Sequence, residues 1–362
     1  MRKFFASHTF IKKGLLCVSV LGLLFVLSGG FIRFFEPSHP SHAVNAQSSN
    51  ASVRPIFNLF GDATATDTPV ATPSITPGMT PSPSVTVGAT PSVTPSTTPT
   101  PSALPHYDHV VVVIEENKGY SEVIGNSAAP YINGLAAQGM SFTDSHAVTH
   151  PSQPNYLDLY SGSDQGVFGD ICPSSAFQGP DLGGQLLSAN LSFAGYSEGL
   201  PAAGALNCTN SATSYARKHN PWADFDDTSG ASTNLPYTSF PTTTAGYSAL
   251  PTVSFVVPNL NNDMHDGTVQ QGDTWLQQNM DAYAQWAKAN NSLLIVTWDE
   301  EDVTNSNNTN QIATIFVGQH VQVGTNNTTI NHYNVLRTLE DMYGLSAANN
   351  AANASDILGV WN

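Results

Sequence analysis

Short apolar runs rich in Val and Ile recur through the last two thirds of this chain, and they constrain its fold more than any other feature. The runs are mostly apolar throughout, a pattern typical of strands that are covered on both faces. The expected strands are 110–114, 141–147, 191–196, 253–257, 293–297 and 312–317. The expected helices lie between them, at 128–138, 155–160, 181–189, 273–289 and 333–343. This alternation predicts an α/β fold, a three-layer α/β/α sandwich around a mostly parallel sheet.

The segments before these runs have a different composition. Residues 1–46 combine a basic start with an apolar run over about 14–32, which indicates either a signal peptide or a retained N-terminal membrane anchor. Residues 47–104 are rich in Thr, Pro and Ser and predict a disordered, extended linker. We therefore expect residues 105–362 to form one catalytic domain that is secreted or tethered at the cell surface.

The charge of the chain restricts its partners. The formal net charge is −16, and residues 105–362 contain only five basic side chains. These are Lys118, Arg217, Lys218, Lys288 and Arg337. A surface this acidic argues against binding nucleic acid. An anionic substrate must then be bound by local groups instead of being attracted by the field of the whole domain.

Two of the three cysteines, Cys172 and Cys208, lie in the expected domain. In an exported protein the simplest interpretation is a disulfide between them. Two free buried cysteines are the alternative. No CxxC spacing supports a zinc site.

Carboxylates follow two of the predicted strands at the point where each strand ends. Glu115-Glu116-Asn117 ends the first strand, and Asp299-Glu300 follows strand 293–297. Oxygen ligands at the carboxyl ends of buried strands are typical of a divalent metal site. The alternative for each of these two groups is that its polar side chains only cap the end of a strand. Strand alternation would direct only one of the two adjacent glutamates into a site.

The sequence His150-Pro151-Ser152-Gln153-Pro154-Asn155 predicts a serine at the start of a helix. Backbone N–H groups and the helix dipole favour an anion there, and a serine so placed can act as a nucleophile. Asn155 could donate to a phosphate oxygen. An ordinary serine helix cap is the alternative.

Basic and histidine side chains lie in the loops. Lys218 and His219 are candidates to bind a phosphate, with an exposed basic loop as the alternative. His265 could protonate a leaving group or ligate a metal, held in one tautomer by Asp263. A polar surface turn is the alternative there. His332, at the start of the last predicted helix, fits a capping or packing role equally well.

Taken in order, these motifs resemble the bacterial phosphoesterase family that includes secreted acid phosphatases and phospholipases C, within the alkaline-phosphatase-like superfamily. The resemblance covers most of residues 105–362 and is nearer to the small secreted acid phosphatases. It rests on motifs at Glu116-Asn117, His150–Tyr156, Lys218-His219, Asn262–Asp266, Asp299-Glu300 and His332.

The resemblance implies roles for these residues. Glu116, Asn117 and Asp299 would hold one divalent metal ion, with a second left open, and Ser152 would be the metal-bound nucleophile. His219, His265 and His150 would line the phosphate pocket. Glu300 stands beside Asp299 where relatives carry paired acids.

The function expected on this basis is that of an exported, metal-dependent acid phosphatase that hydrolyses phosphate monoesters through a phosphoserine. His265 would protonate the leaving oxygen. The substrate would be a phosphorylated small molecule or a phospholipid head group. One alternative is a phospholipase C-type phosphodiesterase whose loop-rich segment 199–250 forms a wider pocket. A non-catalytic surface binding module is the other.

Overall fold

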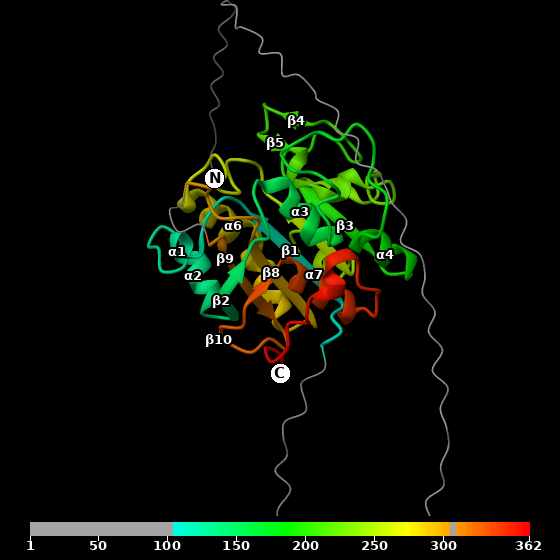
Figure 1. Cartoon of the computed structure of the whole chain (residues 1–362). Coiled ribbons are helices and arrows are strands. Elements are labelled where there is room, and N and C mark those ends of the chain that lie inside the picture. Colours follow the sequence, from blue (N-terminus) through cyan, green and yellow to red (C-terminus); the bar gives the residue numbers. More distant parts are fainter. Residues whose placement is uncertain (1–103, 305–308) are drawn as a thin grey trace, which may run out of the picture. The chain divides into compact units, whose positions relative to one another are not determined.

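The computed structural model describes residues 104–304 and 309–362 (Figure 1). The predicted signal or anchor and nearly all of the predicted linker lie outside the described residues. Within the described part, no helix has the length and apolar character needed to cross a membrane.

A nine-stranded sheet forms the centre of the domain, in the order β10-β2-β9-β8-β1-β7-β3-β6, with β11 also paired to β2. Strand β9 runs antiparallel to its neighbours β2 and β8, and the other strand pairs of this sheet within the described residues are parallel. The strands are β1 (His109–Glu115), β2 (Met140–His146), β3 (Phe193–Ser197), β6 (Asn234–Pro236), β7 (Val253–Val257), β8 (Ser292–Trp298), β9 (Gln311–Gly318), β10 (Gly324–Asn326) and β11 (Ile330–Asn331). The predicted mostly parallel sheet is therefore confirmed.

Helices cover both faces of this sheet. Alternate residues of β1 divide between two buried clusters: Val110, Val112 and Ile114 in one, and Val111 and Val113 in the other. The first cluster also contains side chains of α3 (Ser152–Ser161), α4 (Leu182–Ser188) and α7 (His332–Met342). The second contains side chains of α1 (Tyr120–Val123), α2 (Pro130–Ala136), α5 (Thr244–Tyr247) and α6 (Val269–Ala287). This is the expected three-layer sandwich.

The six predicted strands and five predicted helices all exist, with ends shifted by a few residues. The elements that were not predicted are short. Besides α1, α5, β6, β10 and β11, they include a separate pair, β4 (Thr209–Asn210) and β5 (Tyr215–Ala216), and the 3₁₀ turn Arg217–His219. Because β1, β2, β7 and β8 all run the same way, their carboxyl ends meet at one edge of the sheet.

Three acids buried in the helix layer predict how stability depends on pH. Burial raises the pKa of Asp158, Asp181 and Glu340 to about 7 in each case. Between their ordinary pKa values and about pH 7 the folded state binds more protons than the unfolded state, so stability falls as pH rises through this window. We expect a thermal midpoint several degrees lower at pH 8 than at pH 5.

Calorimetry of Glu340→Gln checks this expectation. The Glu340 Oε1 atom accepts a hydrogen bond from the Ala348 N–H at 2.7 Å, which an amide oxygen can also accept. The variant should lose part of the dependence on pH, whereas Asp226→Asn, at an exposed position, should lose none. A midpoint that rises from pH 5 to pH 8 would contradict the assignment.

Candidate active site

Ser152 lies at the first position of α3, six residues after β2 ends at His146. Its side chain is buried, and Oγ lies 3.2 Å from Glu116 Oε2 and 3.1 Å from Glu300 Oε1. A hydroxyl has one proton, so it can donate to only one of these carboxylates at a time. The second carboxylate remains available to receive that proton.

Three buried carboxyl groups gather around this serine from the ends of two adjacent strands. Glu116 follows β1, and Asp299 and Glu300 follow β8, which pairs with β1. Asp299 Oδ1 accepts a hydrogen bond from the Asn117 N–H at 3.0 Å, whereas its buried Oδ2 atom has no hydrogen-bond partner. Burial, followed by repulsion from Glu116 and Glu300, raises the pKa of Asp299 well above its ordinary value.

This arrangement fits a divalent cation. An unpartnered carboxylate oxygen beside two further acids is costly to bury, and a hard cation with oxygen ligands removes that cost. The chain turns after β1 at Asn117, which has a backbone φ of 51°. In this turn the Asn117 N–H donates to Asp299, which links the ends of β1 and β8. Glu116, Asp299 and Ser152 could thus hold a cation, whereas Asn117 contacts this group through its backbone N–H and stays a predicted ligand.

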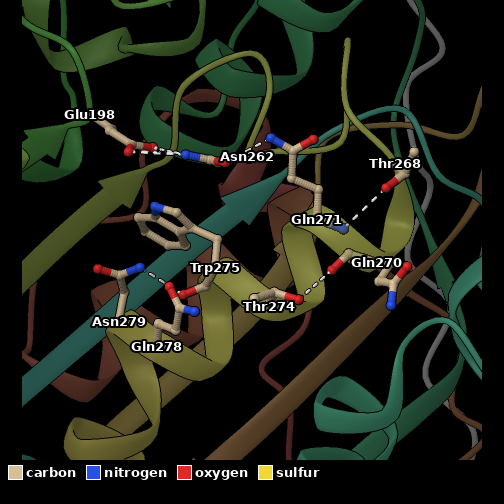
Figure 2. Close-up of a pocket in the computed structure, with 9 residues that line it drawn as sticks. All are labelled: Glu198, Asn262, Thr268, Gln270, Gln271, Thr274, Trp275, Gln278 and Asn279. Carbon is tan, nitrogen blue, oxygen red and sulfur yellow. Dashed lines mark hydrogen bonds between the residues drawn. The ribbon is translucent and has the colours of Figure 1, made fainter.

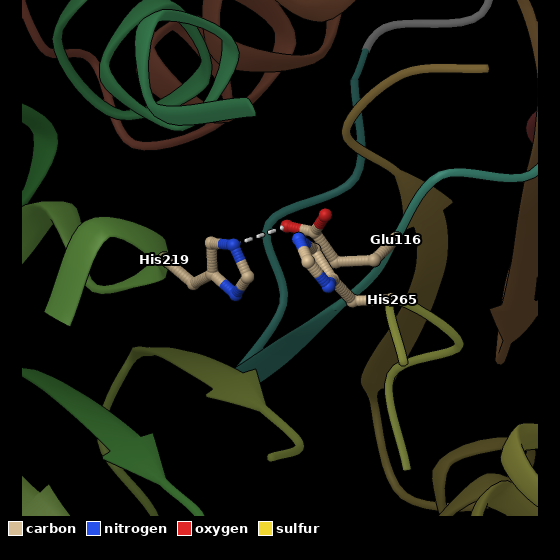
Figure 3. Close-up of side chains that lie close together, drawn as sticks. All are labelled: Glu116, His219 and His265. Carbon is tan, nitrogen blue, oxygen red and sulfur yellow. Dashed lines mark ion pairs between the residues drawn. The ribbon is translucent and has the colours of Figure 1, made fainter. Parts of the chain in front are cut away.

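His219 is the counterion of Glu116. Its Nε2 atom lies 2.9 Å from Glu116 Oε1 (Figure 3). Its Nδ1 atom lies 3.4 Å from Asp263 Oδ2. Burial opposes a charge on the ring, but Glu116 and Asp263 outweigh it and raise the pKa of His219 to about 9. The ring also stacks on Tyr156, with centroids 5.0 Å apart. His219 is therefore a fixed cation at neutral pH.

Lys218 adds a positive charge to this side of the site, next to His265. The nitrogen or oxygen atoms that Glu116, His219 and His265 can offer as ligands all lie within 4.8 Å of one another (Figure 3). Lys218 Nζ lies 3.4 Å from His265 Nε2. These nitrogen atoms are of the kind that bind phosphate oxygens.

The predicted partner of His265 requires a correction. Asp266, not Asp263, contacts its ring, with Oδ1 2.7 Å from Nδ1. Asp263 instead accepts a hydrogen bond from the backbone N–H of His265 at 2.8 Å and faces His219. Because Asp266 occupies Nδ1, the other ring nitrogen, Nε2, is the one on the side of Lys218.

His150 and Asn155 hold the loop before Ser152. Glu300 Oε2 lies 2.5 Å from His150 Nδ1. Burial and the Glu116 charge raise the pKa of Glu300 to about 8, and burial lowers the pKa of His150, so this pair shares one proton at neutral pH. Asn155 Oδ1 accepts hydrogen bonds from the Val148 and Thr149 N–H groups at 3.0 Å each. The amide of Asn155 is thus engaged within the loop that precedes the serine.

Asp170 is a site residue that the sequence did not indicate. Its Oδ2 atom lies 2.6 Å from Lys218 Nζ, and its Oδ1 atom accepts a hydrogen bond from the Gln153 N–H at 3.2 Å. The predicted disulfide is confirmed: Cys172 and Cys208 are bonded, with Cα atoms 5.5 Å apart. The disulfide joins the loop of Asp170 to the strand pair that precedes Lys218.

Two further residues from the sequence analysis, His332 and Glu115, are buried next to Asp299 and Glu116 respectively. His332 Nε2 is 2.7 Å from the Asp299 carbonyl oxygen, and burial lowers the pKa of His332 to about 4, so it is a neutral group that supports Asp299. Glu115 is fully buried, and neither of its carboxyl oxygens has a hydrogen-bond partner. Burial and the nearby Asp263 raise the pKa of Glu115 well above its ordinary value.

A polar hollow of about 590 Å³ opens beside the loop that carries Asp263 (Figure 2). Side chains of the first turns of α6, with Glu198 and Asn262, line it. Asn262 Nδ2 donates to both carboxylate oxygens of Glu198, at 3.0 and 2.9 Å. None of the predicted site residues lines this hollow, so it is separate from the group around Ser152.

Comparisons with known proteins identify the family of this chain. Residues 126–346 match the Phosphoesterase family. A phosphatidylinositol-3-phosphatase of Mycobacterium tuberculosis is 50% identical over 260 residues, which cover 72% of this chain and 85% of that protein. An acid phosphatase of Aspergillus fumigatus is 28% identical over 268 residues, 68% of this chain and 57% of the fungal protein. Among solved structures, a protein in the alkaline phosphatase superfamily from Vibrio parahaemolyticus aligns with 14% identity and a TM-score of 0.49, over 73% of this chain and 74% of that one.

Proposed function

The chain belongs to the phosphoesterase family and is a phosphoric ester hydrolase, and from this premise we propose that it is an exported, metal-dependent acid phosphatase. It hydrolyses phosphate monoesters through a phosphoserine on Ser152. One observation carries the proposal: the Ser152 hydroxyl is buried between two carboxylates, while His219, His265 and Lys218 gather beside it. The basic and apolar start of the chain and the disulfide support export.

A divalent cation bound by Glu116, Asn117, Asp299 and Ser152 would stabilise negative charge on the attacking oxygen and on the phosphate. The unpartnered Oδ2 atom of Asp299 supports this ligand set. His219 serves in a different role, because carboxylates face both of its ring nitrogens and keep it protonated.

The reaction follows from the positions of the side chains. Lys218 and His265 bind the phosphate oxygens. Ser152 Oγ gives its proton to Glu116, the neighbouring carboxyl group that is ionised at mildly acidic pH, and attacks phosphorus. The Oγ–P bond forms as the bond to the leaving oxygen breaks, and His265 Nε2 donates a proton to that oxygen. A water molecule then gives a proton back to His265 and attacks phosphorus. The Oγ–P bond breaks, inorganic phosphate leaves, and Ser152 recovers its proton.

The head group of a phospholipid is the substrate class that the relatives favour most directly. The mycobacterial relative is named a phosphatidylinositol-3-phosphatase, and the 3-phosphate on the inositol ring of such a lipid is a phosphomonoester. A phospholipase C-type activity on diesters remains the second candidate. It is supported by a hollow of about 670 Å³ in the predicted loop-rich segment, lined in part by Leu200, Pro201 and Tyr237.

Hydrolysis of p-nitrophenyl phosphate by the full chain tests the proposal. We expect turnover that is highest at mildly acidic pH, because cationic histidines bind phosphate, and that is abolished by a chelator and restored by a divalent cation. Bis-p-nitrophenyl phosphate, a diester, should be hydrolysed far more slowly. Preference for the diester would replace the phosphatase by the phospholipase C-type activity. Chelator-resistant turnover would remove the metal.

A further inference from the structure

Three large apolar side chains are exposed on two loops that the disulfide joins. Phe168 is 85% exposed, Ile171 50% and Leu206 46%. Phe168 and Ile171 precede Cys172, and Leu206 precedes Cys208. Single exposed apolar residues are common, but three within a few residues of one cross-link indicate a surface that contacts something apolar. We call Phe168, Ile171 and Leu206 the apolar rim.

The apolar rim lies beside the catalytic serine. Asp170, between Phe168 and Ile171, contacts both Lys218 and the Gln153 N–H. The Ile171 N–H donates to Gln153 Oε1 at 2.7 Å, and the Arg217 N–H donates to the Cys208 carbonyl at 2.9 Å. Both loops are therefore tied to residues that adjoin Ser152 or Lys218. Whatever the rim contacts is also brought to the entrance of the site.

The charge around the rim indicates which partner it fits. The chain has 27 Asp and Glu residues against 11 Lys and Arg. The two rim stretches, 165–179 and 199–216, contain one charged residue, Asp170, which Lys218 neutralises at 2.6 Å. An acidic surface is repelled by a bilayer that contains anionic phospholipids. The rim combines exposed apolar side chains with almost no net charge, which suits insertion among lipid head groups.

We propose that the apolar rim inserts into a phospholipid surface and so presents phosphomonoester head groups to Ser152. This inference rests on the proposed phosphatase function and specifies its substrate class: a phospholipid with a terminal phosphate, taken from the bilayer and not from solution. The rim acts by placing the site at the membrane, and it takes no part in the chemical step.

Insertion is tested without catalysis by tryptophan quenching. Phe168→Trp in the full chain is mixed with phosphatidylcholine vesicles that contain phosphatidate and a brominated lipid. We expect the added tryptophan to be quenched. Val323→Trp is the matched control, because Val323 is 69% exposed. Val323 directly precedes β10, which pairs with the first residues of β2. It therefore lies at the edge of the sheet opposite to the carboxyl ends of the strands. In Figure 1, β10 lies at the bottom and β4 and β5 lie at the top. Equal quenching at both positions would overturn insertion by the rim.

Catalysis provides the second test. In the full chain, Phe168→Ser/Ile171→Ser/Leu206→Ser should hydrolyse a water-soluble dibutanoyl phosphatidate at the normal rate. Its rate on long-chain phosphatidate in vesicles should fall at least tenfold. Val323→Ser/Leu358→Ser, with both changes far from the site, should match the original chain on both substrates. The N-terminal segment is common to all these proteins, so it cannot produce the difference.

The other outcomes are also decisive. An equal loss on soluble and vesicle substrates would overturn the proposal, because the rim would then shape the site itself. A dimer seen by light scattering, lost in the triple variant, would show that the rim binds a second copy of the chain. If no protein hydrolyses either phosphatidate while p-nitrophenyl phosphate is cleaved, the substrate class fails. If nothing is cleaved, the phosphatase function fails, and quenching still decides whether the rim inserts.

Discussion

Ser152→Ala lowers the turnover of a phosphate monoester by about 10⁴-fold or more, the scale expected when a nucleophile is removed. The Oγ atom is the hydroxyl oxygen held 3.1–3.2 Å from Glu116 and Glu300, and alanine removes it. The loss of stability should be about 1 kcal/mol, the net value of one hydrogen bond. Pro151 is the N-cap residue of α3, so the substitution leaves the helix cap in place.

Ser161→Ala is the matched control for this variant. Ser161 is also buried on α3, and its hydroxyl can donate to either the Leu157 or the Ser163 carbonyl oxygen, at 2.9 and 3.0 Å. Turnover and thermal midpoint are measured for both variants, and acid quenching with ³²P-labelled substrate should trap label on Ser152 in the original chain only. If Ser152→Ala kept a tenth of the original turnover, Ser152 would be merely the start of a helix.

Asp299→Asn should weaken divalent-metal binding by at least about 100-fold, since changes even to outer-shell partners of a metal typically cost 10–100-fold. The substitution also removes a carboxyl group that Glu116 and Glu300 repel, so it should not destabilise the metal-free protein. A cation at 100 times its dissociation constant stabilises the folded state by about 2.7 kcal/mol. The variant should lose this gain.

Glu115→Gln provides the control for Asp299→Asn. It also changes a buried, unpartnered acid, on a residue that adjoins Glu116 but lies on the other face of β1. Metal content after dialysis and the thermal midpoint with and without cation are compared for the two variants. Unchanged metal content in Asp299→Asn would exclude Asp299 as a ligand. A loss of metal in Glu115→Gln would extend the site to the second glutamate.

The strand ends of this site could be predicted because buried strands have a strong local pattern. A run such as 110–114 must be covered on both faces, and the acids that follow it must then lie at the edge of the sheet. The same reasoning placed Ser152 at the start of a helix, where the structure has it.

The pairing of loop residues could not be predicted in this way. Glu116 meets His219, and Lys218 meets Asp170, across long stretches of chain whose folding depends on the whole domain. Asp263 lies two residues before His265 and Asp266 one residue after it, and only the turn geometry decides which of them contacts the ring. The strands β4 and β5 have two residues each, so they are too short to show a periodic pattern in the sequence.

All ten residues of α3 are buried, so the helix that carries Ser152 has no side open to water. A substitution anywhere along it must be accepted by neighbours on every side, and few will be. The two disulfide-joined loops are largely open to solvent and can vary at little cost to folding. We therefore expect substitutions to be accepted more readily in these loops than in the helix that carries Ser152. A protein engineer who wants a new substrate should randomise the loops and leave the helix unaltered.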